Sequence, residues 1–200
     1  MRRGRNFWLL LPALLWPAPA HAHLTSTGFG PFYDGLAHPF VTPEDLLPVI
    51  ALTLLAGLRG ARPGRWVLFT LPAAWGVGMA AGGPASPPAS AVWLTCGLTI
   101  GLGALTAADC KLPLSAIAGL AATLGLVHGG LNGAGLAHAR GAAQGMAGIA
   151  CAIFVIVALA AGPVASLRAA WARVAVRVAG SWIAAMGLLM LGWTVRNARL

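Results

Sequence analysis

The chain has 200 residues, of which 58% are hydrophobic and only 8% are charged. Soluble domains carry about 25% charged residues, so this composition predicts a polytopic membrane protein surrounded by lipid. The formal net charge of +9 is spread over short basic clusters between apolar stretches, which excludes nucleic acid as a partner and fits membrane orientation instead.

Residues 1–22 have the three parts of a secretory signal peptide. Three arginines precede an apolar core at residues 7–16, and small residues follow up to Ala22. The apolar core is too short to cross a bilayer, which needs about 20 residues. We therefore expect cleavage after Ala22 and a mature chain, residues 23–200, that forms one transmembrane domain.

Six apolar stretches follow the signal peptide, and each is long enough to cross a bilayer when tilt is allowed for. The expected fold class is therefore all-α, with six transmembrane helices. Small residues recur every four positions in the third and fourth stretches, which lets helix backbones approach closely. The first span begins at Thr42, and the others cover residues 66–81, 91–108, 112–131, 142–161 and 174–193.

Basic residues are distributed unequally between the two ends of these spans. Seven lie on the side where the first span ends, and three lie on the opposite side. Cytoplasmic loops carry the excess of Lys and Arg, so we expect a bacterial inner-membrane protein whose mature N-terminus is periplasmic. The seven are Arg59, Arg62, Arg65, Lys111, Arg168, Arg173 and Arg177, and the three are Arg140, Arg196 and Arg199.

Residues 23–37 lead into the first span and are Gly-rich, so we expect turns at their Gly and Pro positions. The region around the start of this span contains most of the acidic residues. Asp34, Glu44 and Asp45 are three of only four carboxylates in the chain, and they lie close to His38. Carboxylate oxygen and imidazole nitrogen together suit divalent transition metals such as nickel, cobalt or zinc. These four side chains are therefore candidate metal ligands.

The same stretch also has the form of a helix start. Thr42 suits the N-cap, Pro43 suits the first helical position, and acidic residues are favoured near the positive end of the helix dipole. A helix cap would account for Glu44 and Asp45 without any ligand, so both interpretations stay open. Pro48 lacks an N–H and is expected to kink this helix.

A second polar cluster lies in the fourth span. His128 and Asn132 are four residues apart, which places them on one face of a helix beside a stripe of glycines. Polar groups within a span usually face a cavity or a partner. The topology brings this end of the fourth span to the same side as the start of the first, so we expect His128 near His38 and count His128 and Asn132 as further candidate metal ligands. The alternative is that both histidines are hydrogen-bonded packing residues.

At these residues the chain resembles the HupE/UreJ family of bacterial membrane proteins. The resemblance covers essentially the whole chain and rests on a signal peptide ending in Ala-His-Ala-His, six following spans, His38-Pro39 and His128-Gly129. It implies a nickel or cobalt permease that serves hydrogenase or urease. It also implies metalloenzyme maturation proteins as partners.

The first family motif looks like HPxxGxDH. Here the initial His38 and Pro39 match, Thr42 stands for the glycine, and Glu44 and Asp45 stand for the Asp-His pair. The ligand chemistry therefore shifts towards oxygen at these positions.

The second family motif resembles HGHAHG. This sequence keeps His128 and Gly129 but has Gly130 and Asn132 where further histidines would stand. The resemblance therefore carries over His128 as a site residue, and it leaves open a cargo other than nickel.

The function we expect is uptake of a divalent metal ion, with nickel or cobalt as cargo and no permanently bound cofactor. Protonated imidazoles cannot bind metal, so uptake should weaken as the pH falls through about 6.5. The first alternative is a non-transporting accessory protein for metalloenzyme maturation. An intramembrane serine hydrolase ranks third, because Ser181 lies in no nucleophile motif and has no identifiable base. We therefore do not expect an enzyme.

Overall fold

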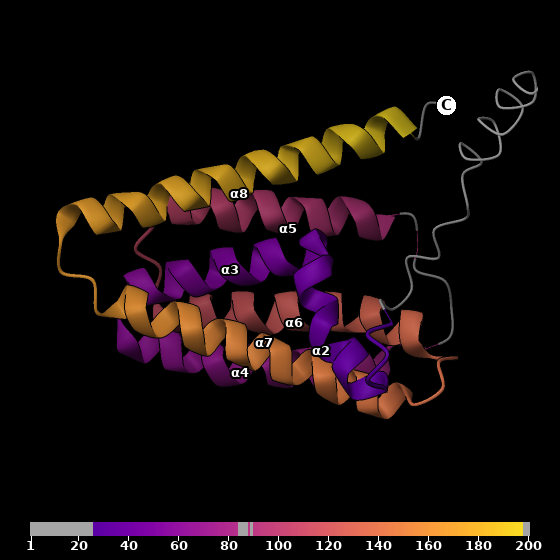
Figure 1. Ribbon diagram of the computed structural model, residues 1–200. Helices are drawn as coiled ribbons and strands as arrows, with labels where there is room; N and C mark the ends of the chain where they lie inside the picture. Colours follow the sequence, from indigo (N-terminus) through magenta and orange to yellow (C-terminus); the bar gives the residue numbers. More distant parts are fainter. Residues whose placement is uncertain (1–25, 84–87, 89, 198–200) are drawn as a thin grey trace, which may run out of the picture.

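The computed structural model describes residues 26–83, 88 and 90–197, and these residues form seven α-helices and no strand. Six helices lie roughly alongside one another, and the short α2 crosses them near one end (Figure 1). The expected signal peptide lies outside the described residues. The helices are α2 (Pro31–Val41), α3 (Pro43–Leu58), α4 (Ala61–Ala81), α5 (Ser90–Ala107), α6 (Leu114–Leu136), α7 (Ala142–Ala165) and α8 (Ala170–Asn197).

Four of these helices, α5 to α8, are long and apolar enough to cross a membrane singly. The pair α2 and α3 passes the same test together, although it is bent by 71°, and would bring the number to five. The expected second span corresponds to α4, whose hydropathy is lowered by Arg62, Arg65 and its Pro and Gly residues. The chain is thus a multi-pass membrane protein. That it has six membrane spans stays a prediction.

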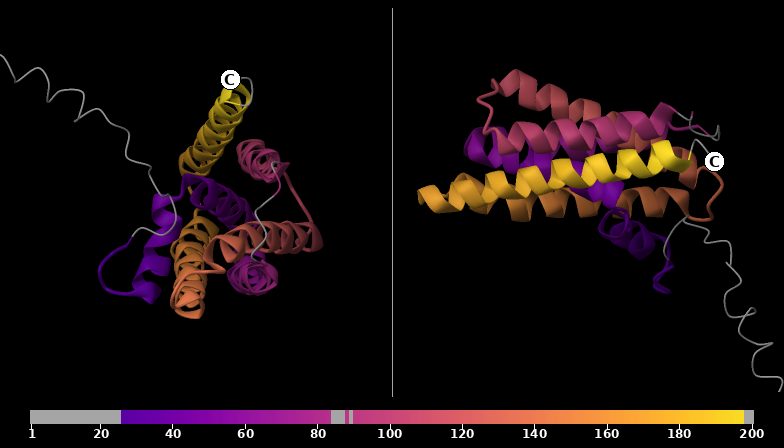
Figure 2. Two further views of the ribbon diagram at one scale, coloured as in Figure 1. Left: turned by 90° about the vertical axis from the view of Figure 1, so that its right-hand side faces the viewer. Right: turned by 90° about the horizontal axis from the view of Figure 1, so that it is seen from above.

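Helix α3 is the centre of the assembly. Ten of its 16 residues are buried, and it packs against every other described helix. Seen end-on, it lies between the pair α5 and α8 and the group α4, α6 and α7 (Figure 2). A helix that is apolar on all sides is stable only in such surroundings. Polar groups at the two ends of α3 are therefore placed to contact several other helices.

Close packing of α4 on α6 positions the second polar cluster. A Cβ added at Gly129 would overlap the backbone of Trp75, and one added at Gly133 would overlap that of Met79. The glycine stripe predicted on the fourth span is thus the surface that contacts α4. Because His128 directly precedes Gly129, this contact fixes its depth and direction.

The lead-in to α3 differs from the prediction. Residues 23–37 were expected to form turns, but α2 begins at Pro31, directly after Gly30, whose φ of 101° favours glycine. The chain is bent by 71° between α2 and α3, at Thr42. Pro43 disfavours helical geometry in the residue before it, so Thr42 has a φ of −115° and a ψ of 88°. Helix α3 then continues through Pro48.

Candidate functional site

A buried carboxylate, Asp45, lies where α2, α3 and α6 meet. Its side chain is only 4% exposed. His128 Nδ1 lies 2.7 Å from Asp45 Oδ1, and Asn132 Nδ2 donates a hydrogen bond of 3.0 Å to Oδ2. His38 Nε2 lies 3.3 Å from the same Oδ2. Two histidines and an amide from two helices therefore surround one carboxylate from a third.

Local structure explains why each of these side chains reaches the cluster. Asp45 is in the first turn of α3, where unpaired N–H groups and the helix dipole favour a negative charge. His38 is in the last turn of α2, and the bend at Thr42 turns it back over the start of α3. His128 and Asn132 project from one face of α6. Broken membrane helices of this kind commonly line ion sites.

The hydrogen bond to Asp45 determines the proton position on His128. An ionised carboxylate only accepts, so Nδ1 of His128 carries a proton, and in the neutral imidazole Nε2 has a lone pair. Nε2 is buried and has no hydrogen-bond partner. Metal-binding histidines have this form, since one ring nitrogen donates to a carboxylate while the other binds the metal. Asp45 thus orients His128.

His38 presents a second buried nitrogen that forms no hydrogen bond. Although its Nε2 is 3.3 Å from Asp45 Oδ2, the two atoms do not have hydrogen-bond geometry, and Nε2 has no other partner. A buried polar group left unpaired costs about 1–3 kcal/mol, so such groups in a native protein call for an explanation. Two of them beside one carboxylate suggest a site that receives a ligand.

Trp75 covers one face of His128 and was not singled out in the sequence. Its ring centroid lies 5.5 Å from that of His128, with 39° between the ring planes, and Trp75 is fully buried. The indole limits rotation of the imidazole and keeps water from that side. The only signal in the sequence was the glycine stripe that predicted close packing beside His128.

Two further candidate ligands lie outside the cluster. Glu44 is exposed and forms no hydrogen bond or ion pair with any described residue. Asp34 accepts hydrogen bonds from the backbone N and Oγ1 of Thr27, at 2.6 and 2.7 Å, which close a turn before α2. The carboxylate of Asp34 therefore has a local structural role, and ligation by Asp34 or Glu44 stays a prediction.

Among residues 26–83, 88 and 90–197, no group of three or more His, Cys, Asp and Glu side chains is positioned to hold a metal ion as it stands. The two oxygens of Asp45 provide a physical reason, because His128 and Asn132 already hydrogen-bond to them. Ligation would use the free imidazole nitrogens and would require His38 to turn away from Asp45.

These features define a polytopic membrane protein with a buried histidine–carboxylate cluster at a broken helix. The family model described as HupE / UreJ protein matches residues 10–190. The chain is also 32% identical over 186 residues to Protein HupE of Rhizobium leguminosarum bv. viciae, which covers 90% of this chain and 94% of the relative. The chain belongs to the HupE/UreJ family. No solved structure matches it significantly.

Proposed function

We propose that this protein is an uptake permease for a divalent transition metal, nickel or cobalt, in the bacterial inner membrane. Its membership of the HupE/UreJ family supports this function. The observation that carries the proposal is a pair of buried imidazole nitrogens beside Asp45 that form no hydrogen bond, Nε2 of His38 and Nε2 of His128. Nitrogen ligands with one carboxylate suit these metals better than Mg²⁺ or Ca²⁺.

In the proposed cycle, the cation exchanges part of its water shell for imidazole nitrogen. His128 is held ready for this step by Asp45 and Trp75, and His38 turns from Asp45 towards the metal. The charge of Asp45 offsets that of the ion, which lowers the cost of bringing it into the bilayer. Asn132 keeps its hydrogen bond to Asp45 and so retains the orientation of the carboxylate.

The proposed topology has six spans, with α2 and α3 as one broken span and α4 as another, and a periplasmic mature N-terminus. The excess of basic residues at the far end of α3 supports this orientation. The Asp45 cluster then lies near the periplasmic surface, where the cation enters.

A non-transporting accessory role in metalloenzyme maturation is the second candidate. It is favoured by the hydrogen bonds that already occupy both oxygens of Asp45. In that case the cluster would only stabilise the packing of α2, α3 and α6 against one another.

Metal accumulation in cells separates the two candidates. Cells with and without the protein are supplied with nickel, cobalt, zinc or copper, and metal content is measured. We expect His38→Ala and His128→Ala to lower nickel or cobalt accumulation about tenfold or more, at equal amounts of protein in the membrane. His138→Ala is the matched control, since His138 is exposed and outside the cluster. Equal accumulation in all strains would favour the accessory role.

A further inference from the structure

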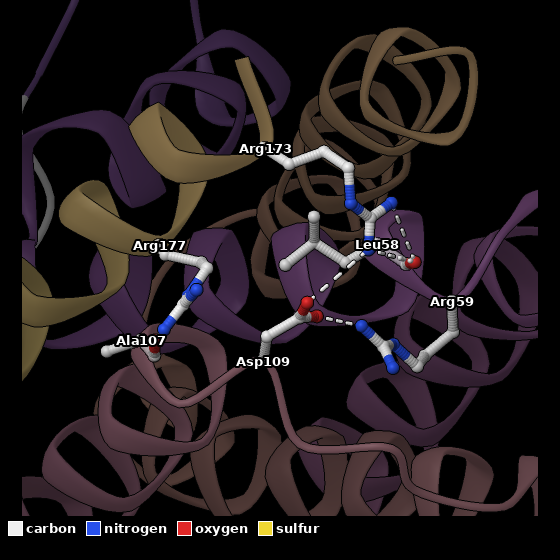
Figure 3. A network of polar contacts seen from close by, with 6 residues as sticks. All are labelled: Leu58, Arg59, Ala107, Asp109, Arg173 and Arg177. Carbon is white, nitrogen blue, oxygen red and sulfur yellow. Dashed lines mark hydrogen bonds and ion pairs between the residues drawn. The ribbon is translucent and has the colours of Figure 1, made fainter. Parts of the chain in front are cut away.

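At the opposite end of α3 from the Asp45 cluster, one carboxylate joins the ends of three helices (Figure 3). Asp109, in the link after α5, forms ion pairs with Arg59 and with Arg173, whose Nη2 lies 3.4 Å from Oδ2. Arg59 directly follows α3, and Arg173 lies in the first turn of α8. The contacts join residues more than 45 positions apart, so the sequence pattern did not indicate them.

Two of the arginines also bind backbone carbonyls at the ends of α3 and α5. Both Nη atoms of Arg173 lie 3.5 Å from Leu58 O, and Arg177 Nε donates a hydrogen bond of 2.9 Å to Ala107 O. The last carbonyls of a helix lack partners within it and attract cations. We call this group the arginine latch, defined as Arg59, Asp109, Arg173 and Arg177.

Asp109 is the carboxylate on which the latch depends. The other three acidic residues of the chain lie in the first turns of α2 and α3, so none can replace it; they are Asp34, Glu44 and Asp45. Asp109 is also the one non-glycine residue in the described ranges with positive φ, 52°, a conformation that Asp tolerates. The backbone therefore turns sharply at the residue that faces the arginines.

Removal of this charge would leave two guanidinium groups facing each other. Burial and, next, the positive charge of Arg173 lower the pKa of Arg59, as expected for two cations that lie on the same carboxylate. Asp109 offsets the repulsion while the latch is closed. Separation of the carboxylate would leave only the long contacts of Arg173 with Leu58 O, at 3.5 Å, between the start of α8 and the end of α3.

We propose that the arginine latch is a gate, which closes the transport path at the end remote from the Asp45 cluster and opens when Asp109 separates from Arg59 and Arg173. This inference rests on the proposed function. Asp45 and Arg59 are 14 positions apart on one helix, which corresponds to about 20 Å. A divalent cation leaving at that end would meet three arginines and one carboxylate. Helix α8 is the least buried candidate span, so it is the element best placed to move.

Access to a buried reporter tests the gate. Thr106 is fully buried one turn before the latch, and its Oγ1 donates to Ala51 O at 2.9 Å. Thr106→Cys is placed in a full-length protein whose native cysteines are replaced by serine. The protein is reconstituted in lipid nanodiscs and treated with a hydrophilic maleimide. We expect Asp109→Asn to speed modification about tenfold or more, whereas the exposed Arg62→Gln changes it less than about twofold.

A second reporter separates opening of the gate from general loosening. Thr99 is fully buried on the same helix, about 10 Å from Thr106. Faster modification of Thr106→Cys alone supports the gate. Faster modification of Thr106→Cys and Thr99→Cys together would overturn it, and so would no change in either reporter.

Nickel binding and nickel accumulation complete the test. We expect Asp109→Asn to keep equilibrium nickel binding within about twofold, because the latch is remote from the cluster, while net accumulation falls about fivefold or more. Accumulation and accessibility that match those of Arg62→Gln would overturn the gate alone. A wild-type protein that accumulates no metal would instead overturn the proposed function, whatever the reporters show.

Discussion

Asp45 and Glu44 are neighbours in the sequence but lie in different surroundings. Asp45 is buried among two histidines and an amide, whereas Glu44 is exposed. Successive residues on a helix point about 100° apart, so only one of the two can face the centre of the bundle. The sequence predicted that carboxylates gather near His38, but which one enters the cluster depends on the rotation of α3 against α6.

Asp45→Asn should lower metal accumulation about tenfold or more, because the neutral amide cannot offset the metal charge or orient His128 as firmly. Glu44→Gln is the matched control and should retain most of the wild-type rate. Accumulation is measured over a range of metal concentrations in cells with equal protein levels. A larger loss with Glu44→Gln than with Asp45→Asn would show that the ligand set has been misassigned.

The His128–Asn132 spacing made these residues recognisable in the sequence, since four positions place two side chains on one helix face. Trp75 and Asp109 could not be recognised in this way. Trp75 contacts His128 because α4 packs on α6. Asp109 contacts Arg59 and Arg173 because α3 and α8 both pack on α5.

At the scale of elements, the helical segments could be predicted because a long apolar segment in a membrane must satisfy its own backbone hydrogen bonds, which a helix does. The short helix α2 was missed, because Gly28, Gly30 and Pro31 suggested turns. Pro31 instead begins a helix, as its fixed φ and missing N–H allow at a first helical position.

The contact of α4 with α6 depends on glycine at particular positions. Gly129→Ala should destabilise the protein by about 1–3 kcal/mol, because the added methyl group would overlap the Trp75 backbone. Gly135→Ala lies on the same helix with open space around its Cβ position, and should be neutral or slightly stabilising. Unfolding in mixed micelles with increasing denaturing detergent measures both. Equal stability of the two variants would contradict the packing of α6 on α4.

At the scale of the whole molecule, α3 links two polar centres. The Asp45 cluster surrounds its beginning and the arginine latch surrounds its end, and both involve helices that are distant in the sequence. This arrangement places a candidate entry site and a candidate gate on one buried helix.

Uptake of metal should depend on pH through the imidazoles. A protonated imidazole has no lone pair for the metal, so uptake should decrease as the external pH is lowered from 8 to 5. Initial rates from pH 5 to 8, at constant free metal concentration and membrane potential, measure this dependence. A flat profile would count against ligation by histidine.

The central claim is that imidazole nitrogens from α2 and α6 bind the metal together. X-ray absorption spectroscopy of the purified, nickel-loaded or cobalt-loaded protein tests it directly. We expect the imidazole contribution to the metal spectrum to decrease by about half in His38→Ala and in His128→Ala, and to remain in His138→Ala. A spectrum that contains only oxygen ligands, or one that neither substitution changes, would contradict the account.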